Sequence, residues 1–237
     1  MLSTINDITE RKQLERKMAW LERLNLIGEM AAGIAHEIRN PMTTVRGFLQ
    51  MLSTKQECLP YHSYFKLMID ELDRANSIIT EFLTLAKNKP VDLKKVNLNS
   101  IITALYPLIY ADAMASENYI ETDLNGISNL FLDEKEIRQL ILNLTRNGLE
   151  AMPAGKCLTI RTFMDGEDII MSVQDQGTGI EPGILDKVGT PFFTTKDNGT
   201  GLGLATCYSI ATRHKAVINL ETGIKGTTFF VRFKKNQ

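Results

Sequence analysis

Between about Leu14 and Leu52, small and apolar residues recur at alternating steps of four and three. This spacing predicts one helix of roughly 40 residues, longer than a lone globular domain usually holds. It favours a bundle or coiled coil, in which the repeated positions form a seam that packs against partner helices. The seam positions are Leu24, Gly28, Ala31, Ala35, Ile38, Met42, Val45, Leu49 and Leu52.

A second amphipathic segment extends from about Tyr64 to Ala86, after a polar stretch that contains Pro60. Two helices joined by one loop make a hairpin, which cannot enclose a core by itself. A homodimer with four helices around one axis is the economical completion. The alternative is a two-helix arm that packs on the C-terminal half of the same chain. The apolar face of the second helix is predicted to contain Leu67, Ile69, Leu72, Ile78, Ile79, Phe82, Leu83 and Leu85.

The stretch "KNKPVDLKK" predicts a linker, and its basic run at Leu93–Lys95 is interpreted as solvated. Beyond it the pattern changes to mixed α/β, which predicts a sandwich of helices over one sheet. Helices are expected at Leu98–Ala115, Asp133–Met152 and about Leu202–Arg213, and strands at Tyr119–Leu124, Cys157–Phe163, Asp168–Gln174, about Ala216–Glu221 and Thr227–Phe233.

Charge and cysteine content exclude several classes of protein. Lys and Arg number 27 against 28 Asp and Glu, so the balance gives no support to a nucleic-acid or membrane-surface role. The three cysteines are far apart and show no metal-ligand spacing, which favours a reducing, cytoplasmic setting. The polar N-terminal segment "INDITERKQLERK" is unlike a signal peptide, and no apolar run approaches the ~18–20 residues of a membrane span. A longer protein with a membrane anchor upstream remains compatible with this chain.

The stretch "RQLILNLTRNGLEAM" predicts a helix with a polar stripe beside its buried face. Asn143, Arg146, Asn147 and Glu150 follow one another at steps of three and four. Amide oxygens suit Mg²⁺ and a guanidinium suits phosphate, so the stripe fits a metal–phosphate site. An ordinary solvent-exposed face would show the same pattern.

Two glycine clusters follow. In "IIMSVQDQGTGI" an apolar strand ends at Asp175, beside Gly177 and Gly179, where a carboxylate can accept a hydrogen bond from an amine; a plain turn explains this motif equally well. Later, Gly199, Gly201 and Gly203 lead into a helix, whose first N–H groups can bind phosphate. The chain has no GK[ST] and no G-x-G-x-x-G spacing here, which excludes the P-loop and the dinucleotide turn.

Taken in order, N-x-x-x-N-G, D-x-G-x-G, P-F-F-T-T-K and G-T-G-L-G-L resemble the N, G1, F and G2 boxes of sensor histidine kinases, and "AHEIRNP" resembles their H box. "NPMTTVRGFLQML" further resembles the sporulation sensor kinases of spore-forming bacilli. The resemblance implies a dimeric helical hairpin followed by an α/β sandwich of GHKL ATPase type. It implies the tail of an upstream PAS-like sensor at 1–10, a dimerisation and phosphotransfer domain at 11–90 and an ATP-binding domain at 91–237.

The resemblance also implies roles for individual residues. His36 matches the phosphoacceptor, Glu37 its acid/base neighbour and Asn40 the residue of the E-x-x-N phosphatase motif. Asn147 matches the Mg²⁺ ligand, and Asp175 the residue that reads the adenine amino group. Further ATP-site residues implied are Asn143, Arg146, Gly177, Gly179, Ile180, Phe193, Thr194, Thr195, Lys196, Thr200, Gly201, Leu202, Gly203, Leu204 and Thr228.

This sequence departs from the family pattern at two places. Gly148 stands where alanine is commoner, which we expect to be harmless, and "HKA" from His214 replaces a His-Gly-Gly turn. Pro41 lies inside the first helix, one turn past His36, and is interpreted as a hinge.

The implied reaction is transfer of the ATP γ-phosphoryl group to His36, then to an aspartate of a response regulator receiver domain. ATP and Mg²⁺ are the implied cofactors, and a small inhibitory protein on the hairpin is a further possible partner. His62, in the loop, and His214, at a helix end suited to C-terminal capping, are weaker candidates for the phosphoacceptor. Asn40 replaces the second ligand of the zinc motif H-E-x-x-H, which excludes that site.

Two other functions stay open. A GHKL ATPase that uses ATP for conformational change, or a serine-directed relative, would need no H box. A scaffold, or a protein dominated by phosphatase activity, would not need intact nucleotide motifs.

Overall fold

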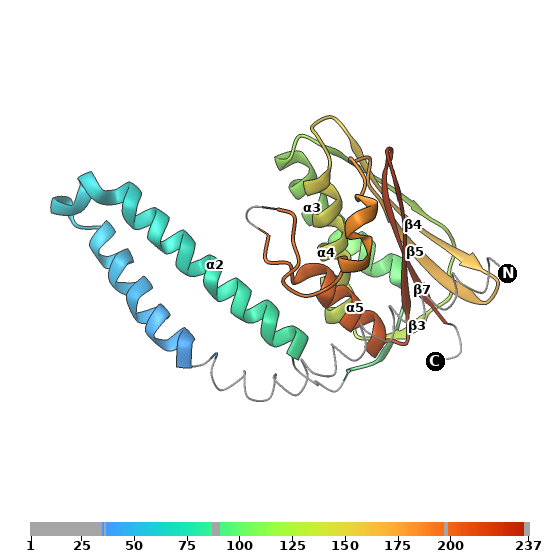
Figure 1. The fold of residues 1–237 in the computed structure, drawn as a ribbon. Helices are drawn as coiled ribbons and strands as arrows, with labels where there is room; N and C mark the ends of the chain where they lie inside the picture. The colour runs from blue at the N-terminus through green and yellow to red at the C-terminus, as the bar shows by residue number, and fades with distance from the viewer. Residues whose placement is uncertain (1–34, 36, 87–90, 197–198, 235–237) are drawn as a thin grey trace. The chain divides into compact units, whose positions relative to one another are not determined.

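The computed structural model describes residues 35, 37–86, 91–196 and 199–234 (Figure 1). The chain divides into two compact units, Met1–Lys89 and Pro90–Gln237. His36 and the heptad positions before Ala35 lie outside the described residues, as does the predicted sensor tail at 1–10. Among the described residues, no helix has both the length and the apolar character needed to cross a membrane.

The N-terminal unit is a helical hairpin. A helix over residues 37–53 is followed by the short 3-10 helix η1 (Gln56–Tyr61) and by α2 (His62–Ala86). Polar contacts join the two long helices: Arg39 Nε donates to Asn76 Oδ1 at 3.0 Å, and Arg46 Nε donates to Asp73 Oδ1 at 2.7 Å. Because Arg39 and Arg46 are two helical turns apart, these contacts fix the alignment of one helix against the other.

The hairpin buries little apolar surface of its own. Among its described hydrophobic residues only Ala35 and Leu83 are buried, with Ile79 and Phe82 packed against them. The seam residues Ile38 and Val45 are 43% and 49% exposed.

The C-terminal unit is built on a five-stranded mixed sheet in the order β2-β4-β5-β7-β6. The β2 strand pairs in parallel with β4, and the other neighbours are antiparallel. The structure confirms the predicted sheet fold, with strand bounds at most two residues from those expected. The strands are β2 (Tyr119–Leu124), β4 (Cys157–Asp165), β5 (Asp168–Gln174), β6 (Val217–Gly223) and β7 (Gly226–Phe233).

A second, two-stranded sheet was not predicted. It pairs β1 (Lys94–Val96) antiparallel with β3 (Leu130–Leu132). The interpretation of Leu93–Lys95 as linker is therefore wrong for Lys94 and Lys95, although both side chains are exposed as expected. Backbone pairing with β3, rather than burial of side chains, defines this strand.

Three helices cover one face of the larger sheet (Figure 1). They are α3 (Leu98–Ala115), α4 (Glu134–Ala151) and α5 (Gly203–Arg213), all close to the predicted ranges. Side-chain caps define where the first two begin: Asn97 accepts from the N–H of Asn99, and Asp133 accepts from those of Lys135 and Glu136.

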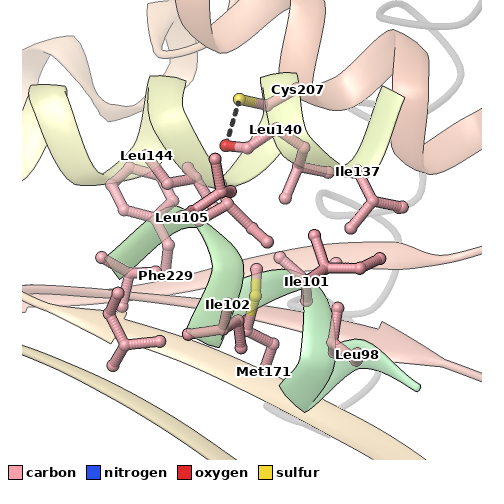
Figure 2. Close-up of a cluster of buried hydrophobic side chains, with 14 of the residues drawn as sticks. Leu98, Ile101, Ile102, Leu105, Ile137, Leu140, Leu144, Met171, Cys207 and Phe229 are labelled. Carbon is pink, nitrogen blue, oxygen red and sulfur yellow. Dashed lines mark hydrogen bonds between the residues drawn. The ribbon is translucent and has the colours of Figure 1, made fainter. Parts of the chain in front are cut away.

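The core lies between this helical layer and the sheet. Figure 2 shows side chains of α3, α4 and α5 meeting Met171 of β5 and Phe229 of β7. Fully burying a large aliphatic side chain contributes about 1.5–3 kcal/mol. Cys207 also lies in this core, and its thiol donates to the Leu140 carbonyl at 3.7 Å (Figure 2). Burial raises the pKa of Cys207 to about 12, so this thiol stays protonated and has a packing role.

His214 joins the end of α5 to the start of α4. The Asp133 N–H donates to His214 Nε2 at 3.0 Å. Because Nε2 accepts, the proton of the neutral ring lies on Nδ1, which donates to the Ile210 carbonyl at 2.9 Å. His214 is 1% exposed, so it has the structural role predicted for a helix end.

Candidate functional site

The polar face of α4 lies beside the first residue of α5. Asn143 Nδ2 donates to the Gly203 carbonyl at 3.1 Å, and Gln139 Nε2 donates to Asn143 Oδ1 at 2.8 Å, which fixes the orientation of the Asn143 amide. Asn147 lies one turn further along. Its Nδ2 atom is buried and has no hydrogen-bond partner among the described residues. A buried amide N–H without an acceptor is costly, so this atom indicates a position where a ligand oxygen or water belongs.

Arg146 belongs to the same sequence stripe but takes another direction. Its Nε donates to Asp112 Oδ2 of α3 at 3.1 Å. The structure therefore does not bring Arg146 together with Asn143, Asn147 and Gly203. Consecutive residues of an α-helix are rotated by about 100° around its axis. The members of the stripe therefore point in somewhat different directions and can face different neighbours.

Asp175 lies at the end of β5 and is 5% exposed. Its Oδ1 accepts from the N–H groups of Gly177 at 2.8 Å and Thr227 at 3.0 Å. Both of these bonds end on the same oxygen, Oδ1. Burial raises the pKa of the Asp175 carboxyl, against the two N–H donors and the charge of Lys196, which lower it.

The first glycine cluster lets several backbones approach closely. A Cβ at Gly177 would lie 2.5 Å from the Ala151 carbonyl oxygen at the end of α4. Gly179 has φ +76°, which favours glycine. The next residue, Ile180, donates its N–H to Thr222 Oγ1 at 2.8 Å, so this loop is tied to the β6–β7 hairpin.

The segment between the glycine clusters forms a loop that closes on itself. The Phe192 N–H donates to the Gly201 carbonyl at 3.0 Å, and Gly201 has φ +67°. A Cβ at Gly201 would lie 2.5 Å from the Phe192 backbone, so this crossing requires glycine. Lys187 lies 5.8 Å from the centre of the Phe193 ring. Thr194 Oγ1 accepts from the Lys196 N–H at 3.1 Å, and Thr195 is exposed.

The second glycine cluster leads into α5 without a side-chain cap. Leu202 occupies the N-cap position and its side chain, which is fully buried, offers no acceptor. Thr200 Oγ1 accepts from the Leu202 N–H at 3.2 Å, which holds the preceding turn. Leu204 packs partly buried against the core. A helix start of this kind leaves backbone N–H groups for an anion.

Lys196 reaches the polar face of α4. Its ammonium donates to Glu150 Oε2 and lies 3.5 Å from Asn147 Oδ1. The structure thus joins the predicted Lys196 and Asn147, and it adds Glu150, which the sequence placed on the stripe without a role.

The last strand presents Thr227 rather than Thr228 to Asp175. Thr227 is buried and donates its N–H to Asp175 Oδ1, while its hydroxyl lies 3.0 Å from that of Thr222. Thr228 pairs in register with Gln174 and Glu221, and paired residues share one face of a sheet. Its side chain is therefore on the face opposite the helices. The strict burial alternation of β7 is the signal that identifies Thr227.

In the N-terminal unit, Glu37 and Asn40 are exposed on the helix over residues 37–53. Thr43 and Thr44 donate their hydroxyls to the carbonyls of Arg39 and Asn40, at 2.9 Å and 3.2 Å. Pro41 is exposed inside this helix, and its role as a hinge stays a prediction.

Two families match this chain. Residues 26–90 match the His Kinase A (phospho-acceptor) domain. Residues 132–237 match the Histidine kinase-, DNA gyrase B-, and HSP90-like ATPase family. The chain belongs to the sensor histidine kinases.

Curated histidine kinases match over nearly the whole chain. Sporulation kinase E of Bacillus subtilis (strain 168) is 38% identical over 240 residues, covering 100% of this chain and 32% of that protein. Sporulation kinase C of the same organism is 36% identical and covers 97% of this chain and 56% of that protein. The chain therefore spans about a third to a half of the length of these relatives.

Solved histidine kinases share the fold. ThkA in complex with the response regulator protein TrrA has a TM-score of 0.64 and 29% identity, covering 94% of this chain and 66% of that one. Full-length ShkA in complex with AMPPNP has a TM-score of 0.77 at 22% identity, covering 86% of this chain and 45% of that one, and supports the fold.

Proposed function

We propose that this chain is the kinase core of a two-component system or phosphorelay. ATP binds to the domain at 91–237, and its γ-phosphoryl group is transferred to His36 in the domain at 11–90. The group then passes to an aspartate of a response regulator receiver domain. Residues 1–10 form the end of an upstream sensor in this proposal.

The observation that carries the proposal is the convergence of three motifs in the C-terminal unit. Gly148 of α4 packs against Asp175, with its Cβ position 3.3 Å from the Asp175 Cβ. On the same helix Asn143 contacts Gly203. One helix therefore links a buried carboxylate suited to an adenine amino group with a glycine-rich helix start suited to phosphates.

The residues present fit Mg²⁺ as well as ATP. Asn147 offers an amide oxygen already in contact with the cationic Lys196, and no described residue accepts from its buried N–H group. When bound, the metal supplies neutralisation of phosphate charge. Asn147 is its proposed ligand, Lys196 and the N–H groups near Gly203 contact phosphate oxygens, and Asp175 and Thr227 hold the adenine.

The transfer step needs a neutral imidazole at His36. One ring nitrogen attacks the γ-phosphorus in line, the bond to the leaving oxygen of ADP breaks, and the N–P bond forms. Glu37 holds the proton of the other ring nitrogen and raises the nucleophilicity of the first. In a separate reaction, Asn40 orients a water that attacks the phosphorus of the receiver's aspartyl phosphate; the bond to the aspartate oxygen breaks and inorganic phosphate is released, which is phosphatase activity.

The proposed partners follow from the hairpin and the relatives. The exposed seam at Ile38 and Val45 supports a homodimer. ThkA, solved with a response regulator, supports a receiver domain as the second partner. A small inhibitory protein on the hairpin is a further proposal.

The test is labelling with [γ-³²P]ATP. We expect phosphate that is labile in acid and stable in alkali, as a phosphoramidate is, and we expect His36→Gln to abolish it. Acid-stable label, or undiminished label in His36→Gln, would overturn the assignment.

The alternative is a GHKL ATPase, or a phosphatase-dominant scaffold with little kinase activity. ATP hydrolysis that persists without any labelled protein would favour the first. Dephosphorylation of a phosphorylated receiver, without labelling of the chain, would favour the second.

A further inference from the structure

A positive charge already occupies the position in front of Asn147. The Lys196 ammonium lies between two oxygens of α4, the Glu150 carboxylate and the Asn147 amide. A carboxylate and an amide oxygen are the ligand types that Mg²⁺ prefers. The ammonium therefore stands where the metal of the proposed function would have to lie, since Asn147 is its proposed ligand.

The helix and the loop contribute separately to this arrangement. Glu150 follows Asn147 by three residues, which places both side chains on one face of α4. Lys196 comes from the loop between the glycine clusters, so the ion pair ties this loop to the helix. The Lys196 and Glu150 side chains are 37% and 58% exposed, and ion pairs this exposed are weak and exchange readily.

The charges of Glu150 and Lys196 make this ion pair respond to whether a nucleotide binds with or without a metal ion. Glu150 repels the triphosphate of a nucleotide that arrives without metal, and it holds Lys196 away from the phosphates. A divalent cation satisfies Glu150 and Asn147 together and releases the ammonium to a phosphate oxygen.

We propose that Glu150 and Lys196 form a latch that makes nucleotide binding depend on a divalent cation. In the free protein Lys196 substitutes for the metal between Asn147 and Glu150. In the loaded protein the metal takes this place, with Glu150 as a second protein ligand beside the Asn147 amide, and Lys196 pairs with phosphate. This inference rests on the proposed function, because it requires that the site binds nucleotide.

The first test measures binding of ATP to the 237-residue chain by calorimetry, with Mg²⁺ and with EDTA. Glu150→Gln removes the repulsion and frees Lys196, so metal-free affinity should rise about three- to tenfold. The ratio of affinities with and without Mg²⁺ should fall by at least the same factor. Glu134→Gln is the matched control, because it removes a carboxylate from an ion pair at the other end of α4. It should leave both affinities unchanged.

The second test needs no nucleotide. Trypsin cleavage after Lys196 should be several-fold faster in Glu150→Gln than in the parent chain or in Glu134→Gln, because the latch no longer holds this side chain. Equal cleavage rates would overturn the latch.

The outcomes separate the two proposals. If the parent chain binds ATP, and Glu150→Gln has the same ratio of ATP affinities with and without Mg²⁺ as the parent, the latch is wrong and the kinase assignment stands. If the parent chain fails to bind ATP, the proposed function is wrong and the metal role of Glu150 falls with it.

Discussion

The carboxylate of Asp175 is buried at the end of β5, and that burial raises its pKa above that of a free aspartate. In the pH range between the unfolded and folded pKa values, the folded chain binds more protons than the unfolded chain. The free energy of unfolding therefore falls as pH rises through this range, and the ionised group costs stability at neutral pH. A residue that is unfavourable for folding yet held by two backbone donors is typical of a binding site.

Asp175→Asn should therefore separate binding from stability. At pH 7 we expect urea denaturation to show a free energy of unfolding equal to or above that of the parent, because the buried charge is gone. This advantage should shrink as pH is lowered toward 4. Calorimetry should show no ATP binding, since Asn offers an N–H where the adenine amino group needs an acceptor. Normal ATP binding would mean that Asp175 does not read the base.

Gly148 is more constrained than the sequence indicated. A Cβ there would lie 2.5 Å from Leu158 Cδ1, and Leu158 is fully buried. Gly148→Ala gains about 1 kcal/mol of helix propensity but costs about 1–3 kcal/mol of overpacking. We expect a net loss of about 1 kcal/mol in urea denaturation. Adding Leu158→Val makes room for the new Cβ and should recover part of the lost free energy of unfolding. A more stable Gly148→Ala would show that Leu158 adapts freely.

At the scale of single residues, the sequence predicted which types of side chain gather in the C-terminal unit better than it predicted where those side chains point. Asn143 contacts Gly203, and Asp175 lies beside Gly148 of α4, so the structure brings these motifs together, while the ATP-binding roles of Asn143, Asn147 and Asp175 stay predictions. Arg146 turns to Asp112 of α3, a partner 34 residues away that no local pattern reveals. Thr227 is buried on the helix-facing side of β7 and Thr228 lies on its other side, a difference that the period-2 burial along β7 shows, while the role of Thr228 at the adenine site stays a prediction.

At the scale of elements, the junction between α5 and α4 rests on His214. Its ring accepts from the Asp133 N–H, and Asp133 in turn caps α4. His214→Ala leaves that N–H without its acceptor and opens a cavity, so we expect a loss of about 2 kcal/mol or more in the free energy of unfolding. His62→Ala, at an exposed histidine that begins α2, is the control and should change little. Equal effects would show that the ring bonds of His214 are unimportant.

The long elements could be predicted because their patterns repeat. The ranges of α3, β2 and β5 agree with expectation because caps and polar breaks mark their ends. The pair β1 and β3 could not be predicted, since each strand has three residues and is defined by its distant partner. Pro107 lies inside α3 with its side chain exposed, although proline usually predicts the end of a helix.

At the scale of the whole molecule, the two units differ in how much they bury. The C-terminal unit has a continuous core, whereas the hairpin has two buried hydrophobic residues among those described. The seam residue Val45 is 49% exposed. We expect the parent chain to be a dimer by light scattering at micromolar concentration, with Val45→Glu monomeric, because a charge at a packed seam is costly. Gln50→Glu, at an exposed polar position, is the control. A dimeric Val45→Glu would place the interface elsewhere.

Because the two units bury different amounts of apolar surface, their folded fractions depend differently on the concentration of the protein. A helical hairpin completed by a second copy obeys mass action, so its folded fraction rises with the amount of chain present. The C-terminal unit owes its core to one chain, and its folded fraction is the same at any dilution. If the hairpin dimerises as proposed, dilution would therefore unfold the unit that matches the phospho-acceptor family while the ATPase-like unit stays folded.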